Sequence, residues 1–157
     1  MKKPICVLAL SWFSVCASAD DVMTDPETWY RDAYAPLWAE DPESNAGKML
    51  EFYAEVVETH STDGQITHTD KAAWLREPMR EWLADGWLTS ELQGLVVDRI
   101  NETTASFKTS WLDRYEESYE ELACGWYLAD LVDGAWRFTA YADIDCDAHG
   151  FRAGVDS

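Results

Sequence analysis

The sequence predicts an α+β domain in which helices come first and antiparallel strands follow. Apolar residues recur at helical spacing within residues 24–57 and again within 70–86. The second half instead contains two long runs rich in β-branched and aromatic residues, 92–112 and 122–141, each interrupted by a turn signal. Helices followed by antiparallel hairpins are typical of α+β folds. A chain of 157 residues is long enough for one such domain with its own core.

The N-terminal segment has the features of a secretory signal peptide. Two lysines precede a short apolar run over residues 5–15, and small residues at 17–19 form an Ala-x-Ala cleavage signal. A membrane anchor would need roughly 20 apolar residues, more than this run supplies. A lipoprotein modified at Cys16 is a weaker alternative, because the residues before it do not fit that signal. We therefore expect a signal peptide at residues 1–19, a mature start at Asp20, and a periplasmic or secreted protein.

The chain is strongly acidic. It has 30 Asp and Glu residues against 12 Lys and Arg residues, which gives a formal net charge of −18. Two of the lysines lie in the predicted signal peptide, so the mature chain is more acidic still. Nucleic acids and anionic lipids bind positive protein surfaces, so this composition argues against a nucleic-acid partner and against a membrane partner after signal cleavage.

Two helices are expected near the start of the mature chain. The first covers residues 24–38, with a capping residue before Pro26, and Pro36 should kink or end it. The second begins at Asp41 and follows the clearest helical periodicity in the chain. Its apolar positions are Ala46, Met49, Leu50, Tyr53 and Val57.

A small polar hairpin and a third helix should follow. Residues 57–69 flank an Asp-Gly pair at 63–64, which favours a tight turn. Thr69 or Asp70 can cap the next helix, and Gly86 should end it. Pro78 is expected to break this helix into two pieces.

The hairpin over residues 92–112 places a carboxylate among apolar side chains. Pairing Ile100 with Thr103 puts Asp98 on the face that carries Phe107 and Trp111. Apolar surroundings raise the pKa of a carboxyl group, as a general acid or base at neutral pH requires. The alternatives are an ion pair with a nearby arginine, or a one-residue slip that turns Asp98 to water.

The last hairpin, over residues 122–141, is the strongest structural signal in the sequence. Asp133-Gly134 joins its strands, and this dipeptide suits a turn that needs positive φ values. In the register set by this turn, Cys124 faces Asp143, three residues before Cys146. An exported protein can oxidise the two cysteines, so both a disulfide and two separate thiols remain open.

The final hairpin also resembles a known family. Gly125-Trp126-Tyr127, the segment 133–138, Tyr141 and Asp143 resemble the closing strands of the nuclear transport factor 2-like superfamily, in particular its SnoaL-like branch. The resemblance implies a curved antiparallel sheet wrapped around N-terminal helices, with a conical pocket at the open end. The superfamily includes isomerases, dehydratases, hydrolases and non-catalytic binding domains, and none of their catalytic sets maps onto this chain.

The expected organisation is a SnoaL-like domain at residues 20–146 followed by a short polar tail at 147–157. Asp98 and Asp143 are the candidate catalytic carboxylates. Aromatic side chains of the predicted stripes and strands are the candidate ligand-binding residues. They are Tyr53, Trp82, Phe107, Trp111, Trp126 and Tyr141.

No metal or cofactor is expected. The predicted register of the small hairpin points His60 and His68 to opposite faces, and no His-x-x-x-His, paired-cysteine or glycine-rich phosphate motif is present.

Three functions remain open, and the sequence leaves undecided whether the protein is an enzyme. The favoured one is a non-catalytic domain whose apolar pocket binds a small apolar molecule. The others are a lyase or isomerase with a pocket carboxylate as general base, and an interaction module that forms a homodimer through its sheet face.

Overall fold

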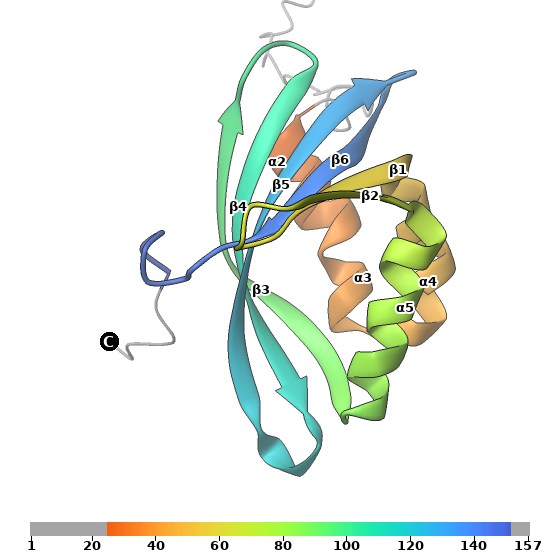
Figure 1. Ribbon diagram of the computed structural model, residues 1–157, viewed down its shortest axis with the longest axis vertical. Helices are drawn as coiled ribbons and strands as arrows, with labels where there is room; N and C mark the ends of the chain where they lie inside the picture. Colours follow the sequence, from red (N-terminus) through yellow and green to blue (C-terminus); the bar gives the residue numbers. More distant parts are fainter. Residues whose placement is uncertain (1–24, 152–157) are drawn as a thin grey trace, which may run out of the picture.

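A computed structural model describes residues 25–151, in which helices cover one face of a curved sheet (Figure 1). The predicted signal peptide lies outside the described residues. The helices are α2 Pro26–Thr28, α3 Pro36–Ala39, α4 Pro42–Met49 and α5 Lys71–Ala84. A π-helical segment, Trp29–Tyr34, joins α2 to α3, and short 3₁₀ turns cover Leu50–Phe52 and Glu116–Ser118. None of the helices within the described residues is long and apolar enough to cross a membrane.

The sheet has six strands in the order β2-β1-β6-β5-β4-β3. Their bounds are β1 Tyr53–His60, β2 Ile66–Asp70, β3 Trp87–Arg99, β4 Thr104–Tyr115, β5 Glu120–Val132 and β6 Ala135–Asp143. Neighbouring strands are antiparallel except β1 and β6, which are parallel. The predicted α+β class, with a curved sheet around N-terminal helices, is confirmed. We call the face that carries the helices the concave face and the opposite face the convex face.

The first helical segment changes at Pro36, which was expected to kink or end it. The π-helical stretch ends at Tyr34, and α3 begins at Pro36 itself. The chain stays helical to Ala39 because the turn before the proline is a π-turn, in which Ala35 N–H donates to the Tyr30 carbonyl at 2.9 Å. A proline lacks an N–H, and a wider turn accommodates its ring. The segment can therefore bury Tyr30 and Tyr34 together against the sheet.

The second helix is shorter than predicted. It ends at Met49, and Tyr53 and Val57, which were assigned to its apolar stripe, lie in β1. Both side chains are buried. A spacing of four places two residues on one face of a helix and also on one face of a strand, so periodicity did not separate the two structures here.

Helix α5 is continuous through Pro78, so the expected break is wrong. Asp70 caps it by accepting hydrogen bonds from the backbone N–H groups of Ala72 and Ala73. Its buried residues, Leu75 and Met79, lie on both sides of the proline. Packing of this stripe against the sheet outweighs the one hydrogen bond that Pro78 cannot make.

A β-bulge in β3 corrects the predicted position of Asp98. Leu92 pairs with Trp111, as the predicted register requires, but the next pair is Gly94 with Ser110, so Gln93 is an extra residue. Beyond the bulge the register is shifted by one residue. Asp98 is therefore exposed on the convex face, and its predicted place among buried aromatic residues is wrong.

A second bulge, in β6, turns side chains toward the concave face, whereas the bulge in β3 turns Asp98 away from it. The turn at Asp133-Gly134 pairs Val132 with Ala135, as predicted, but Thr139 is then skipped in the pairing. Tyr141 consequently faces Tyr127 on the concave side, and Asp143 pairs with Gly125. The predicted pairing of Asp143 with Cys124 is wrong for this reason.

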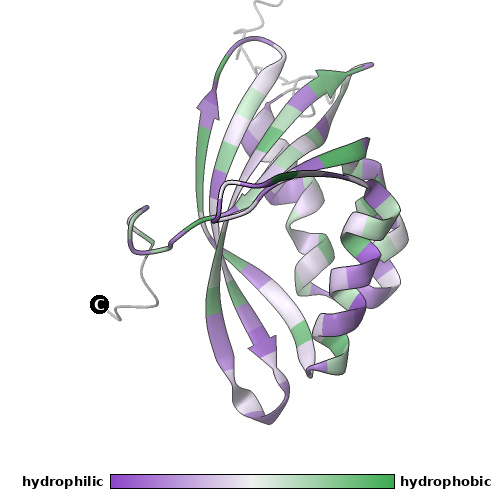
Figure 2. Cartoon of the chain, viewed as in Figure 1, coloured by the Kyte–Doolittle hydropathy of each residue, from purple (hydrophilic) through white to green (hydrophobic). Residues whose placement is uncertain are grey.

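The core lies between the helices and the concave face and consists mainly of aromatic rings. Phe138 is at its centre, with ring centroids 4.8 Å from Tyr34 and 4.9 Å from Trp29. Hydrophobic and hydrophilic residues alternate along the strands, as expected for a sheet with one face against helices (Figure 2). The core also contains Trp136, which is fully buried.

Cys124 and Cys146 form a disulfide, which the sequence had left open. Their Cα atoms are 5.4 Å apart. The chain bends back after β6, and Ile144 N–H donates to the Cys124 carbonyl at 3.1 Å. The disulfide holds the C-terminal segment on the convex side of the sheet (Figure 1). There the ring of Phe151 lies against Gly94.

Candidate functional site

Two adjoining cavities open between α5 and the concave face of the sheet. Their volumes are about 460 Å³ and 280 Å³. The larger extends along α5 toward β1 and β2, and the smaller extends toward the ends of β3, β4 and β5. The residues common to both linings are Trp38, Trp82, Tyr127, Tyr141 and Asp143. Together the cavities have the size of a small-molecule site and a wall rich in aromatic side chains.

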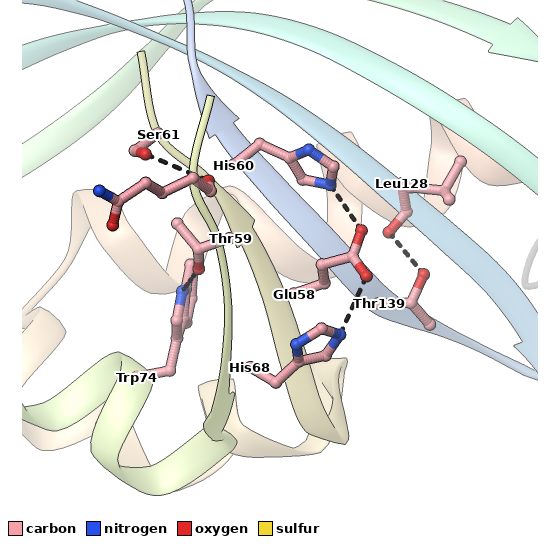
Figure 3. A network of polar contacts seen from close by, with 9 residues as sticks. Glu58, Thr59, His60, Ser61, His68, Trp74, Leu128 and Thr139 are labelled. Carbon is pink, nitrogen blue, oxygen red and sulfur yellow. Dashed lines mark hydrogen bonds and ion pairs between the residues drawn. The ribbon is translucent and has the colours of Figure 1, made fainter. Parts of the chain in front are cut away.

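The larger cavity has a wall of rings fixed by contacts between α5 and the sheet. Trp74 of α5 donates its indole N–H to Thr59 Oγ1 of β1 at 2.8 Å (Figure 3). Its ring centroid lies 4.8 Å from Tyr53 and 5.5 Å from Tyr141. The indole thus connects α5 to the sheet through both its N–H and its ring.

The tyrosines in the wall and directly behind it are neutral hydrogen-bonding groups. Burial raises the pKa of Tyr34, Tyr53 and Tyr127 well above the ordinary value. The hydroxyls of Tyr34 and Tyr53 share a hydrogen bond. Trp38 lies nearby, and its indole N–H is buried without a hydrogen-bond partner in the described residues.

Asp143 stands where the two cavities meet. The bulge in β6 turns both Tyr141 and Asp143 to the concave side, and the Tyr141 hydroxyl donates to a carboxylate oxygen of Asp143. Burial first, and the adjacent Asp143 charge second, raise the pKa of the Tyr141 hydroxyl, which therefore stays a donor. This hydrogen bond orients an exposed carboxylate toward the cavity mouth.

Asp113 is a second carboxylate of the site, which sequence reasoning missed. It lines the smaller cavity and accepts a hydrogen bond from Ser90 Oγ. The same Ser90 oxygen accepts the indole N–H of Trp87 at 3.2 Å. Burial, reinforced by the charge of Glu121, raises the pKa of Asp113 to about 6. The strand pattern contained a signal, because Asp113 continues the two-residue alternation of Phe107, Thr109 and Trp111.

The structure brings together most of the predicted site residues. Four of the six candidate ligand-binding residues line the cavities, namely Tyr53, Trp82, Trp111 and Tyr141. Phe107 is fully buried in the core and does not line them. Trp126 lies on the convex face, 6.4 Å from the ring of His60, so its assignment to the pocket is wrong. Asp98 is remote from both cavities because of the bulge in β3.

The two histidines of the small hairpin share a face, contrary to prediction. The loop between β1 and β2 covers residues 61–65 and shifts the pairing by one residue, so that Glu58 pairs with His68. Figure 3 shows Glu58 between the imidazoles of His60 and His68. These rings lower the pKa of the Glu58 carboxyl. Within the described residues, no group of three or more His, Cys, Asp or Glu side chains is arranged to hold a metal ion.

Comparison with known proteins identifies the fold. No protein-family model and no curated protein matches the chain. Solved structures do match. An NTF-2-like protein of unknown function from Shewanella oneidensis has a TM-score of 0.55 at 12% identity, over 71% of this chain and 89% of that one.

Two further structures are similar. A Caulobacter vibrioides protein with a cystatin-like fold has a TM-score of 0.55 at 15% identity, over 81% of this chain and 93% of that one. A candidate polyketide cyclase from Xanthomonas campestris has a TM-score of 0.51 at 19% identity, over 78% of this chain and 92% of that one. The chain therefore has the nuclear transport factor 2-like, cystatin-like fold. The predicted fold is thereby confirmed, whereas membership of the superfamily and of its SnoaL-like branch stays a prediction.

Proposed function

We propose that the protein is an exported domain that binds a small, largely apolar molecule in the two adjoining cavities, without catalysing a reaction on it. The observation that carries this proposal is the set of aromatic side chains shared by both cavities, between α5 and the concave face of the sheet. Apolar, concave sites with few polar groups are the usual form of small-molecule sites. The structural neighbours contribute the fold alone, and the ligand chemistry comes from the residues of this chain.

The binding proposal is tested with a panel of soluble, one-ring and two-ring organic compounds. Binding is measured as the increase in melting temperature of the mature protein. We expect part of the panel to stabilise the protein, and Trp82→Ala to abolish that stabilisation, because Trp82 lines both cavities. The matched control is Trp126→Ala, which removes the same ring from the convex face. Stabilisation that survives in the Trp82→Ala protein and disappears in the control would place the ligand outside the cavities.

Export is proposed from the N-terminal sequence. Its support is the combination of a charged start, an apolar run and the Ala-x-Ala signal. The disulfide of the folded domain suits an oxidising compartment. Mass spectrometry of protein collected from outside the cytoplasm should find a chain that starts at Asp20. An intact chain that stays in the cytoplasm would refute export.

A second function, proton transfer by a lyase or isomerase, is favoured by Asp113. A carboxyl group with a pKa near 6, held by Ser90 inside a cavity, meets the requirement for a general base at neutral pH. Asp113 therefore replaces Asp98 as the proposed general base of a lyase or isomerase. Incorporation of solvent deuterium into a bound ketone would reveal such proton transfer, and Asp113→Asn should abolish it. No incorporation into any ketone that binds leaves the non-catalytic proposal in place.

Pairing of two copies through the convex face is the remaining interaction-module proposal. The C-terminal segment lies on this face, where the disulfide at Cys124 and the contact of Phe151 with Gly94 hold it. A homodimer would have to accommodate that segment. Light scattering after size-exclusion chromatography decides between a monomer and a dimer.

A further inference from the structure

The charges that line the two cavities all have one sign. The acidic side chains are Glu77, Glu81, Asp113, Glu121 and Asp143. None of the described residues that line either cavity is a lysine, an arginine or a histidine. The formal charge of the chain is also strongly negative, so distant basic residues do not balance this region. The potential at the cavity mouth therefore repels anions and attracts cations.

The cavities that these carboxylates line also have a wall of aromatic rings. Trp38 and Trp82, which line both cavities, have ring centroids 6.5 Å apart, and Trp82 lies 5.8 Å from Trp87. On the sheet side, Tyr127 and Tyr141 are 5.0 Å apart. The face of such a ring attracts a cation through its quadrupole, and several rings around one space form the kind of cage that binds organic ammonium groups.

Asp143 belongs both to the acidic lining of the cavities and to the region of the aromatic rings. It lies at the boundary of the cavities, and the Tyr141 hydroxyl holds one of its oxygens. Its carboxylate is thus held at the hydroxyl end of Tyr141, in a wall that also contains Tyr127. A neutral apolar ligand would use the rings and make no use of the carboxylate, and an anionic ligand would be opposed by all five acidic side chains.

We propose that the ligand of these cavities is a small organic cation, with its ammonium group beside Asp143 and its apolar body among the rings. This inference rests on the proposed binding function and adds the charge of the ligand. The proposed ligand is an amine or a quaternary ammonium compound. Metal ions do not use aromatic walls, and larger cationic peptides exceed the volume of the cavities.

The test uses three compounds of one size that differ in charge: benzylamine, benzyl alcohol and benzoate. Their dissociation constants for the mature protein are measured by tryptophan fluorescence at pH 7.5 and low salt. Benzylamine should bind about tenfold more tightly than benzyl alcohol, with benzoate weaker still. Asp143→Asn should weaken benzylamine binding about tenfold and leave benzyl alcohol binding unchanged. Asp98→Asn removes one exposed negative charge from the convex face and should change neither.

The outcomes separate this inference from the binding proposal. Equal binding of benzylamine and benzyl alcohol would overturn the cation inference and leave a small-molecule cavity standing. Absence of benzylamine binding would also overturn the cation inference. The wider compound panel separately tests whether the cavities bind any small molecule. If Asp143→Asn does not fold, Glu81→Gln on the exposed rim of α5 replaces it, with a smaller loss of benzylamine affinity expected. An unchanged benzylamine affinity in every acidic-to-amide variant that folds would contradict the role of the carboxylates.

Discussion

Asp113 shows how a single buried carboxyl group links the site to stability. Its pKa in the folded protein is about 6, against 3.8 for the free side chain. The folded protein therefore keeps a proton on Asp113 that the unfolded chain releases between about pH 4 and pH 6. The contribution of this group to stability falls as the pH rises through that window, and above it the buried charge is fully unfavourable.

Replacing Asp113 by asparagine should stabilise the protein at neutral pH. The amide oxygen can still accept the hydrogen bond from Ser90, and no buried charge remains. The shift corresponds to about 2 kcal/mol once partial exposure to solvent is allowed for. Asp113→Asn should raise the melting temperature by several degrees at pH 7.5 and by almost nothing at pH 4. A constant difference at both pH values would mean that folding does not raise the pKa of Asp113. Asp98→Asn is the control for the loss of one negative charge.

At the residue scale, aromatic character placed four of the six candidate ligand-binding residues correctly, but not Phe107 or Trp126. Tyr53, Trp82, Trp111 and Tyr141 were assigned to the pocket as large rings on predicted stripes and strands, and they line it. Charged residues were harder to place. The direction of a carboxylate depends on the register of its strand, and a single extra residue exchanges the two faces.

At the element scale, two β-bulges determine which side chains reach the cavities. Gln93 and Thr139 are each an extra residue in their strands. The first turns Asp98 to the convex face, and the second turns Tyr141 and Asp143 to the concave face. Bulges increase the bend and twist of a sheet, so the curvature that opens the cone and the composition of its wall have the same cause. Turn residues predict which strands pair, but they contain no information about a bulge several residues away.

The prolines illustrate a second limit of sequence reasoning. Pro36 and Pro78 were both expected to interrupt helices. Pro36 is the first residue of α3, after the π-helical stretch ends at Tyr34, whereas Pro78 lies inside the continuous helix α5. At Pro78, packing of the buried neighbours Leu75 and Met79 outweighs the hydrogen bond that the proline cannot make. Helix starts were predicted well, because caps such as Asp70 act through adjacent backbone groups.

Gly94 provides a test of the bulge and of the C-terminal contact. A Cβ atom at this position would lie 2.7 Å from Ser110 Oγ and 2.8 Å from the ring of Phe151. Gly94→Ala should therefore destabilise the protein by about 1–2 kcal/mol in urea unfolding, because the ring must move. Gly47, in α4, is the matched control, since a Cβ there meets nothing within 4 Å. Gly47→Ala should stabilise by about 0.5–1 kcal/mol, and the same sign for both variants would contradict the packing described.

At the scale of the whole molecule, the disulfide ties the C-terminal segment to the centre of the sheet. Cys124 and Cys146 are 22 residues apart in sequence. A cross-link that closes a loop of this length restricts the unfolded chain and stabilises the folded one by about 3 kcal/mol. Cys146→Ser should lower the free energy of unfolding by this amount. Reduction of the wild-type protein should give the same loss, and stability unaffected by reduction would show that the bond is absent in solution.

The central claim is that the two cavities form one ligand site. The most direct measurement is the NMR spectrum of the tryptophan indole N–H groups while a binding compound from the panel, or benzylamine, is added. Signals of Trp38 and Trp82, which line both cavities, should shift, and those of Trp126 and Trp136 should stay in place. Shifts confined to Trp126 on the convex face, or saturating binding with no shift of Trp38 or Trp82, would contradict the claim.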